Sequence, residues 1–209
     1  MAESPVFILG EHDAGKTTLF RLMMGEDEFE RSPATCGKPK EADVRLGGHW
    51  DVSLFLNRER LRIYDFAGNV TQRAEIEGQI SAALKEHGLF GDELINVFYC
   101  IDGYKLFGED ADEREGIVTR CRADMDLVAR VYAANEIEDK RKRFYIVVTR
   151  GDEPIAQGKG PDDVQDALGD LVKDGLSAVG GGDDRMLIFG LCDQKKREEA
   201  FDKLTDIKF

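Results

Sequence analysis

The chain has 209 residues, of which 42% are hydrophobic and 34% are charged, a balance that fits a globular protein better than a disordered one. Its net charge of -13 gives a surface that repels nucleic acid and anionic lipid, so we expect neither as a general partner. The sequence contains no signal peptide, no apolar stretch of bilayer length and no myristoylation or prenylation motif. Its 4 cysteines form no C-x-x-C or Cys/His cluster. We therefore expect a cytoplasmic protein with free thiols, no zinc site and no lipid anchor.

The first predicted strand leads directly into a phosphate-binding motif. Residues 6–9 form a short apolar run that is typical of a buried strand. Residues 10–17 then match G-x-x-x-x-G-K-[ST], the P-loop, and residues 18–24 have the apolar spacing of a helix. This context suits the motif, because the unpaired N–H groups at the start of a helix attract anions.

The P-loop predicts a nucleoside polyphosphate with Mg²⁺ as the ligand. Gly10 and Gly15 allow the backbone N–H groups to converge on a phosphate. Lys16 would reach the β- and γ-phosphates, and the Thr17 hydroxyl would hold Mg²⁺. The predicted phosphate-binding residues are Gly10, Glu11, His12, Asp13, Ala14, Gly15, Lys16, Thr17 and Thr18.

Strands and helices are expected to alternate along the rest of the chain. Residues 26–40 are expected to form an exposed loop, and residues 42–46 and 51–56 to form a hairpin about a Gly-Gly turn. Further strands are expected at 61–64, 94–101, 144–148 and 186–189. Helices are expected at 70–87, from a loop at 103–116 to about residue 135, from Pro161 through Leu171, and at 194–205.

This alternation predicts a doubly wound α/β fold, with helices on both faces of a mostly parallel central sheet, in a single domain over residues 1–209. Ligands of such sheets bind at the carboxyl ends of the strands. The P-loop, Asp65–Gly68 and Thr149–Asp152 each follow a predicted strand. We therefore expect these three polar motifs to converge on one edge of the sheet.

In this order the motifs resemble those of a small GTPase of the Ras-like class, which implies the three-layer P-loop NTPase fold of a guanine-nucleotide-binding (G) domain. Asp65–Gly68 resembles the D-x-x-G of switch II, whose Asp holds Mg²⁺ through water and whose Gly contacts the γ-phosphate. Thr149–Asp152 resembles the [NT]-K-x-D motif, whose Asp accepts from the guanine edge. Thr35 resembles the switch I Thr, although Ser32 lies in the same loop. Leu191 and Cys192 lie where the family has its S-A-x motif, which they match poorly.

The resemblance assigns Mg²⁺ to Thr17, Thr35 and Asp65, base recognition to Thr149, Arg150 and Asp152, and catalysis to Lys16, Gly68 and Asn69. Asn69 stands where many members of the class carry a Gln that orients the attacking water. Because Asn is one methylene shorter, we expect slow intrinsic hydrolysis of GTP.

Three positions depart from the family pattern. Arg150 replaces a Lys, although its stem can still lie along the base. His12 can either crowd an arginine finger supplied by a partner or contact the γ-phosphate side. Asp13 must face away from the phosphates or pair with a cation such as Arg150.

The favoured interpretation is a GTP/GDP-binding switch that requires Mg²⁺, hydrolyses GTP slowly and acts through unidentified effectors and regulators. A nucleotide-locked scaffold with little hydrolysis is the first alternative. A P-loop kinase is the second, but the sequence offers no compact Arg-rich lid, and this interpretation leaves Thr149–Asp152 unexplained. Alone, Asp65–Gly68 can be an ordinary turn and Thr149–Asp152 a capped loop.

Overall fold

The computed structural model describes residues 3–23, 40–45, 60–66, 73–87, 93–182, 185–191 and 194–207. Six strands form one sheet: β1 (Glu3–Gly10), β2 (Lys40–Arg45), β3 (Arg60–Asp65), β4 (Ile95–Asp102), β5 (Lys142–Thr149) and β6 (Met186–Ile188). The strand order is β2-β3-β1-β4-β5-β6. Strand β2 is antiparallel to β3, and all other neighbours are parallel. The mostly parallel sheet expected from the sequence is confirmed.

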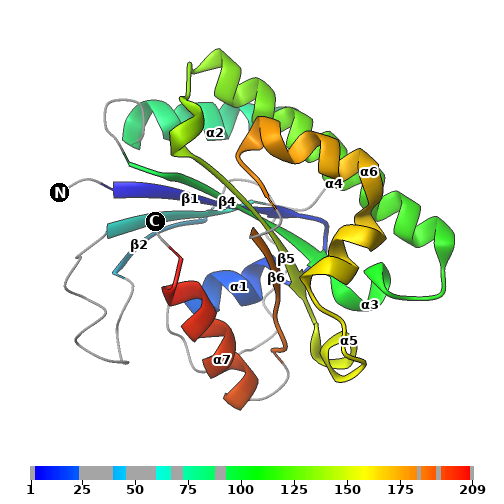
Figure 1. Cartoon of the computed structure of the whole chain (residues 1–209). Helices are drawn as coiled ribbons and strands as arrows, with labels where there is room; N and C mark the ends of the chain where they lie inside the picture. The colour runs from blue at the N-terminus through cyan, green and yellow to red at the C-terminus, as the bar shows by residue number, and fades with distance from the viewer. Residues whose placement is uncertain are drawn as a thin grey trace.

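Helices cover both faces of this sheet (Figure 1). The helices are α1 (Lys16–Met23), α2 (Arg73–His87), α3 (Gly103–Leu106), α4 (Ala111–Ala134), α5 (Asp152–Ala156), α6 (Pro161–Val179) and α7 (Gln194–Thr205), with a 3₁₀ turn, η3 (Asp139–Arg141). Helices α2, α4 and α6 lie on one face, and α1 and α7 lie on the other. Among the described helices, none is long and apolar enough to cross a bilayer.

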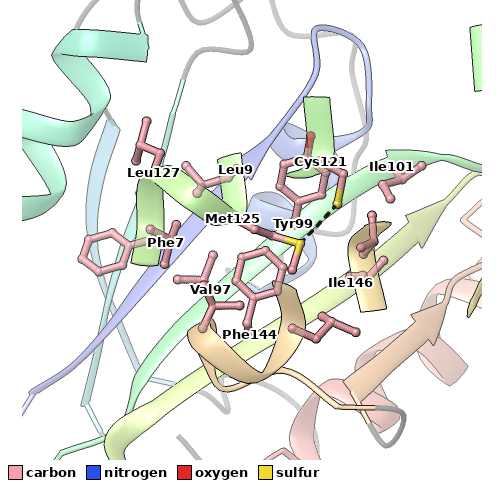
Figure 2. Close-up of a cluster of buried hydrophobic side chains, with 14 of the residues drawn as sticks. Phe7, Leu9, Val97, Tyr99, Ile101, Cys121, Met125, Leu127, Phe144 and Ile146 are labelled. Atoms are coloured by element: carbon pink, nitrogen blue, oxygen red, sulfur yellow. Dashed lines mark hydrogen bonds between the residues drawn. The ribbon is translucent and has the colours of Figure 1, made fainter. Parts of the chain in front are cut away.

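The central strands are mostly apolar because both of their faces are buried. All eight residues of β4 are buried. Val97, Tyr99 and Ile101 belong to the core against α4 and α6, and Phe98 and Cys100 belong to the core against α1. Figure 2 shows the first of these cores, in which side chains of α4 pack against side chains of β1, β4 and β5. The prediction that an apolar run marks a strand with helices on both faces is therefore confirmed for β4.

Most of the expected elements are confirmed, but two segments differ. The expected loop at 103–116 contains the short helix α3 and the beginning of α4, which starts at Ala111 after the N-cap Asp110. Helix α5, directly after β5, was not predicted. The expected hairpin is only partly described: 40–45 pairs with β3, and 51–56 lies outside the described residues.

The topology places the carboxyl ends of the parallel strands at one edge of the sheet. Strand β1 ends at Gly10, β3 at Asp65 and β5 at Thr149, and these strands are linked through β1–β3, β1–β4 and β4–β5 pairing. The described residues of the three polar motifs therefore converge on a common edge, to which the end of β4 at Asp102 also belongs.

Candidate functional site

The loop between β1 and α1 has the backbone shape that curls around an anion. Gly10 has φ 132° and Gly15 has φ 76°, both in the region that favours glycine. A Cβ at Gly10 would collide with the carbonyl oxygen of Cys100 on β4, so this turn needs glycine for space as well as conformation. Asp13 also has a positive φ, of 61°. Alternating backbone of this kind turns successive N–H groups toward one point.

Lys16 lies inside this loop with only 6% of its surface exposed. Its Nζ donates to the carbonyl oxygen of Glu11, so the ammonium group is held across the loop. Burial lowers the pKa of Lys16, and nearby acidic groups, among them Asp65 and Asp13, act in the opposite direction. The side chain is thus a buried cation at the point where the backbone curls.

Thr17 and Asp65 meet beside this cation. The Thr17 hydroxyl donates to Oδ2 of Asp65 at 3.1 Å, and Asp65 is fully buried at the end of β3. Hydroxyl and carboxylate oxygens fit Mg²⁺, which usually binds through one or two protein ligands together with phosphates and waters. Within the described ranges no group of three His, Cys, Asp or Glu side chains could hold a metal by itself. The donor set therefore fits a Mg²⁺ that arrives with a polyphosphate.

Four residues of the predicted site lie outside the described residues. They are Thr35, Gly68, Asn69 and Cys192. Ser32, the alternative to Thr35, also lies outside them. The Mg²⁺ role of Thr35, the catalytic roles of Gly68 and Asn69, and the place of Cys192 in the nucleotide site stay predictions.

Thr149 joins the base motif to the phosphate loop. Its hydroxyl oxygen lies 2.9 Å from the carbonyl oxygen of Ala14 and 3.2 Å from that of Ile101, and the residue is fully buried. One hydroxyl proton is shared between these two acceptors. Thr149 thereby connects the ends of β5 and β4 to the P-loop, at residues that are far apart in the sequence.

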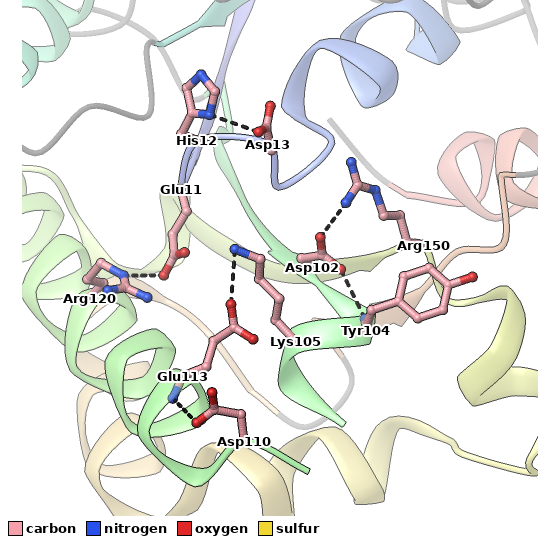
Figure 3. A network of polar contacts seen from close by, with 10 residues as sticks. All are labelled: Glu11, His12, Asp13, Asp102, Tyr104, Lys105, Asp110, Glu113, Arg120 and Arg150. Atoms are coloured by element: carbon pink, nitrogen blue, oxygen red, sulfur yellow. Dashed lines mark hydrogen bonds and ion pairs between the residues drawn. The ribbon is translucent and has the colours of Figure 1, made fainter. Parts of the chain in front are cut away.

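Arg150 pairs with Asp102 and not with Asp13, for which it was one possible partner. Its Nη1 lies 2.6 Å from Oδ2 of Asp102, whereas Asp13 pairs with Nδ1 of His12 at 3.0 Å (Figure 3). The reason is register: Asp102 is the strand partner of Thr149, so it lies next to Arg150. Oδ1 of Asp102 also accepts from the backbone N–H of Tyr104 and caps α3.

Asp152, the first residue of α5, lies against the segment that follows β6. Its Oδ2 accepts from the backbone N–H of Leu191 at 3.2 Å, and its Oδ1 lies 3.1 Å from Nζ of Lys196 on α7. The structure therefore brings Asp152 and Leu191 together, as the resemblance implies, although 190–192 match the family motif poorly. Thr18 lies in the first turn of α1.

Sequence reasoning missed three charged residues at this edge. Asp102 follows an apolar strand, so the strand-end rule that selected Asp65 would also have found it. Arg120 on α4 pairs with the Glu11 side chain in the P-loop (Figure 3), and Lys196 reaches Asp152 from α7. No local spacing marks these two helical residues, because their contacts depend on how α4 and α7 pack.

Comparison with known proteins identifies the architecture. No protein-family model matches the chain, and no curated protein sequence matches it. Among solved structures, a chain of the signal recognition particle receptor SRb-GTP/SRX complex from Chaetomium thermophilum is similar with a TM-score of 0.61 and 10% identity, covering 99% of each chain. The Arl6 BBS3 small GTPase from Trypanosoma brucei, solved with GppNp, is similar with a TM-score of 0.52 and 14% identity, covering 98% of each chain.

The mammalian signal recognition particle receptor structure is also similar, with a TM-score of 0.53 and 12% identity over 98% of this chain and 100% of that one. At such low identity these likenesses establish the fold alone. The polar residues at the strand ends give the same assignment independently, because the P-loop, Asp65 and Thr149–Asp152 occur in the order and on the strands that this fold requires. The chain therefore has the fold of the Ras-like P-loop small GTPases, as its motifs predicted.

Proposed function

We propose that this protein binds GTP and GDP together with Mg²⁺ and acts as a guanine-nucleotide switch that hydrolyses GTP slowly. The observation that supports this most strongly is the Thr149 hydroxyl, 2.9 Å from the carbonyl oxygen of Ala14. This contact sets the base motif directly against the phosphate loop, so one nucleotide can reach both. The fold similarity to a small GTPase solved with GppNp and to an SRb-GTP complex agrees with this proposal.

Different residues of the described part of the chain would bind the phosphates, the Mg²⁺ and the base. The N–H groups of residues 11–16 and the Lys16 ammonium would hold the phosphates, and Thr17 and Asp65 would hold Mg²⁺. Mg²⁺ supplies neutralisation of the charge on the phosphate oxygens. Asp152 would accept from the N–H donors on the guanine edge, where adenine offers a different pattern, while the Arg150 stem flanks the base.

Hydrolysis in this proposal is limited by the positioning of water. The chain has Asn69 after Gly68, where a longer amide would be needed to reach the attacking water. The same residue favours the alternative function, a nucleotide-locked scaffold. A single-turnover assay with bound GTP separates the two: a first-order rate clearly above that of buffer supports the switch, and a rate equal to it supports the scaffold.

Nucleotide specificity gives the sharper test. Calorimetric titration with GDP, ADP and XDP in the presence of Mg²⁺ should show binding of GDP alone. Asp152→Asn should weaken GDP binding by about 100-fold and improve XDP binding, because an amide donor suits the extra oxygen of xanthine. Equal binding of ADP and GDP by the native protein, or an Asp152→Asn variant with unchanged preference, would contradict the proposal.

A further inference from the structure

The carboxylate of Asp152 is held by a lysine that belongs to none of the nucleotide motifs. Lys196 lies on α7, in the opposite core layer to α4, and its Nζ is 3.1 Å from Oδ1 of Asp152. Leu191 N–H donates to the other oxygen at 3.2 Å. The Asp152 side chain is only 14% exposed, so both contacts act on a carboxylate with little freedom to turn.

Gly190 provides the space for this contact. A Cβ at this position would lie 2.8 Å from Oδ1 of Asp152 and 3.0 Å from Cδ of Lys196. The lysine stem therefore passes directly over the glycine on its way to the carboxylate. Any side chain at residue 190 would force Asp152 or Lys196 to move. The observed contact between Lys196 and Asp152 therefore depends on glycine at residue 190.

The shape of a carboxylate suits a ligand with paired donors. Its two oxygens can accept two parallel N–H groups, which is the pattern that the guanine edge offers. A charge-assisted contact also fixes the plane of the carboxylate before the ligand arrives, which lowers the ordering cost of binding. We infer that Lys196 is a positioning residue that orients Asp152 for guanine, an inference that rests on the function proposed above.

Two neighbouring lysines of α7 make a matched test. Lys195 is 85% exposed and pairs loosely with Glu199 at 3.8 Å, so Lys195→Met changes the net charge equally without touching Asp152. Affinities of Lys196→Met and Lys195→Met for GDP and for IDP would be measured by calorimetry. IDP lacks the 2-amino donor, so it makes one hydrogen bond fewer to Asp152 and depends less on its alignment.

Lys196→Met should weaken GDP binding by about tenfold and IDP binding by less, so the GDP/IDP ratio falls, while Lys195→Met leaves both unchanged. Lys196→Arg should restore most of the ratio, because a cation again reaches the carboxylate. Gly190→Ala should lower the ratio as Lys196→Met does, since it crowds the same contact. Melting of the nucleotide-free variants serves as the control for folding.

The outcomes separate the two proposals. If the native protein binds GDP but Lys196→Met and Lys195→Met have the same GDP/IDP affinity ratio, the positioning role is overturned and the proposed function is left intact. A variant that melts earlier with an unchanged ratio gives Lys196 a purely structural role and overturns the inference as well. Native protein that binds no guanine nucleotide overturns both.

Discussion

The site has a phosphate side, residues 10–17 with Asp65, and a base side, residues 149–152 with 190–191. On the phosphate side, Lys16 and Thr17 contact residues of the nucleotide motifs themselves. On the base side, Arg150 and Asp152 contact charged residues that belong to none of these motifs. Lys16 donates to Glu11 and Thr17 to Asp65. The partners of Arg150 and Asp152 are Asp102 and Lys196. Lys16 is therefore held within its own loop and Thr17 by the neighbouring strand end, while Arg150 and Asp152 depend on residues that no nucleotide motif contains.

Backbone conformation supports the same contrast. The non-glycine residues with positive φ in the described part of the chain are Asp13, Glu136 and Arg150. Asp13 lies in a loop whose glycines impose the turn, but Arg150, with φ 50°, lies between a strand and a short helix. Such backbone persists where surrounding contacts hold it, and the Asp102 ion pair supplies one of them.

The largest effect is expected from Lys16→Met on the phosphate side. It should lower the affinity for GTP by more than about 100-fold, because a charge-assisted contact to the phosphates is lost. The melting temperature of the nucleotide-free protein should not fall, since the variant removes a desolvated cation from a site with 6% exposure. Calorimetry and thermal melting measure the two. Retained GTP affinity, or melting that falls together with affinity, would contradict this account of the phosphate side.

The second-largest effect is expected at Thr149, which connects the base side to the phosphate side. Thr149→Val keeps the side-chain shape but removes the hydroxyl shared by Ala14 and Ile101, leaving buried carbonyls without this donor. The free energy of unfolding should fall by about 1–3 kcal/mol, and nucleotide release should become faster. Thr149→Ser, measured beside it by denaturant unfolding, should retain most of the stability. A Ser variant as weak as the Val variant would point to packing instead of the hydrogen bond.

A smaller effect is expected from the ion pair on the base side. Asp102→Asn keeps an oxygen to cap α3 but removes the charge that faces Arg150. Because the Arg150 side chain is 50% exposed, the loss should be modest, about a threefold faster release of a fluorescent GDP analogue. Arg150→Met should match it, and the double variant should add little to either single change. Additive effects would show that the two residues act separately.

The smallest effect is expected for a thiol beside the phosphate side. Burial raises the pKa of Cys100 to about 12, with Lys16 acting in the opposite direction. Since the folded pKa lies above the ordinary value of 9.0, the thiol stays protonated at neutral pH, and its contribution to stability is lost only as pH rises from about 9 toward 12. Alkylation at pH 8 followed by peptide mapping should leave Cys100 unmodified until denaturant is added. Rapid modification of the native protein would show that this core opens.

The sequence predicted the fold wherever an element was long enough to have a period. Strands β1, β4 and β5 each contain a mostly apolar run, and α7 was predicted with its bounds at 194–205. Helices α3 and α5 have four and five residues, too few for a helical repeat to be recognised. Helix α4 starts at Ala111, inside the segment expected as a loop running into a helix, and its acidic first turn is what the start of a helix favours.

The site was predictable only as far as its motifs reach. Asp65 and Thr149 were identified because each follows a buried strand, and each lies at the expected edge. The contact of Arg150 with Asp102 was not predicted, because the strand register that places Asp102 beside Arg150 cannot be read from spacing. Lys196 was missed for a related reason, since its reach depends on the absence of a side chain at Gly190.

The division of the interior by the sheet has a consequence for sequence change. Val6 and Ile8 pack in the core beside α1 and α7, while Phe7 and Leu9 pack in the core beside α4 and α6. Neighbouring residues of this strand therefore belong to cores formed with different sets of helices. An altered volume beside α1 and α7 has to be compensated within that layer, because no side chain crosses the backbone to relieve it. The two layers can therefore diverge at different rates, while the strand ends between them keep a common geometry.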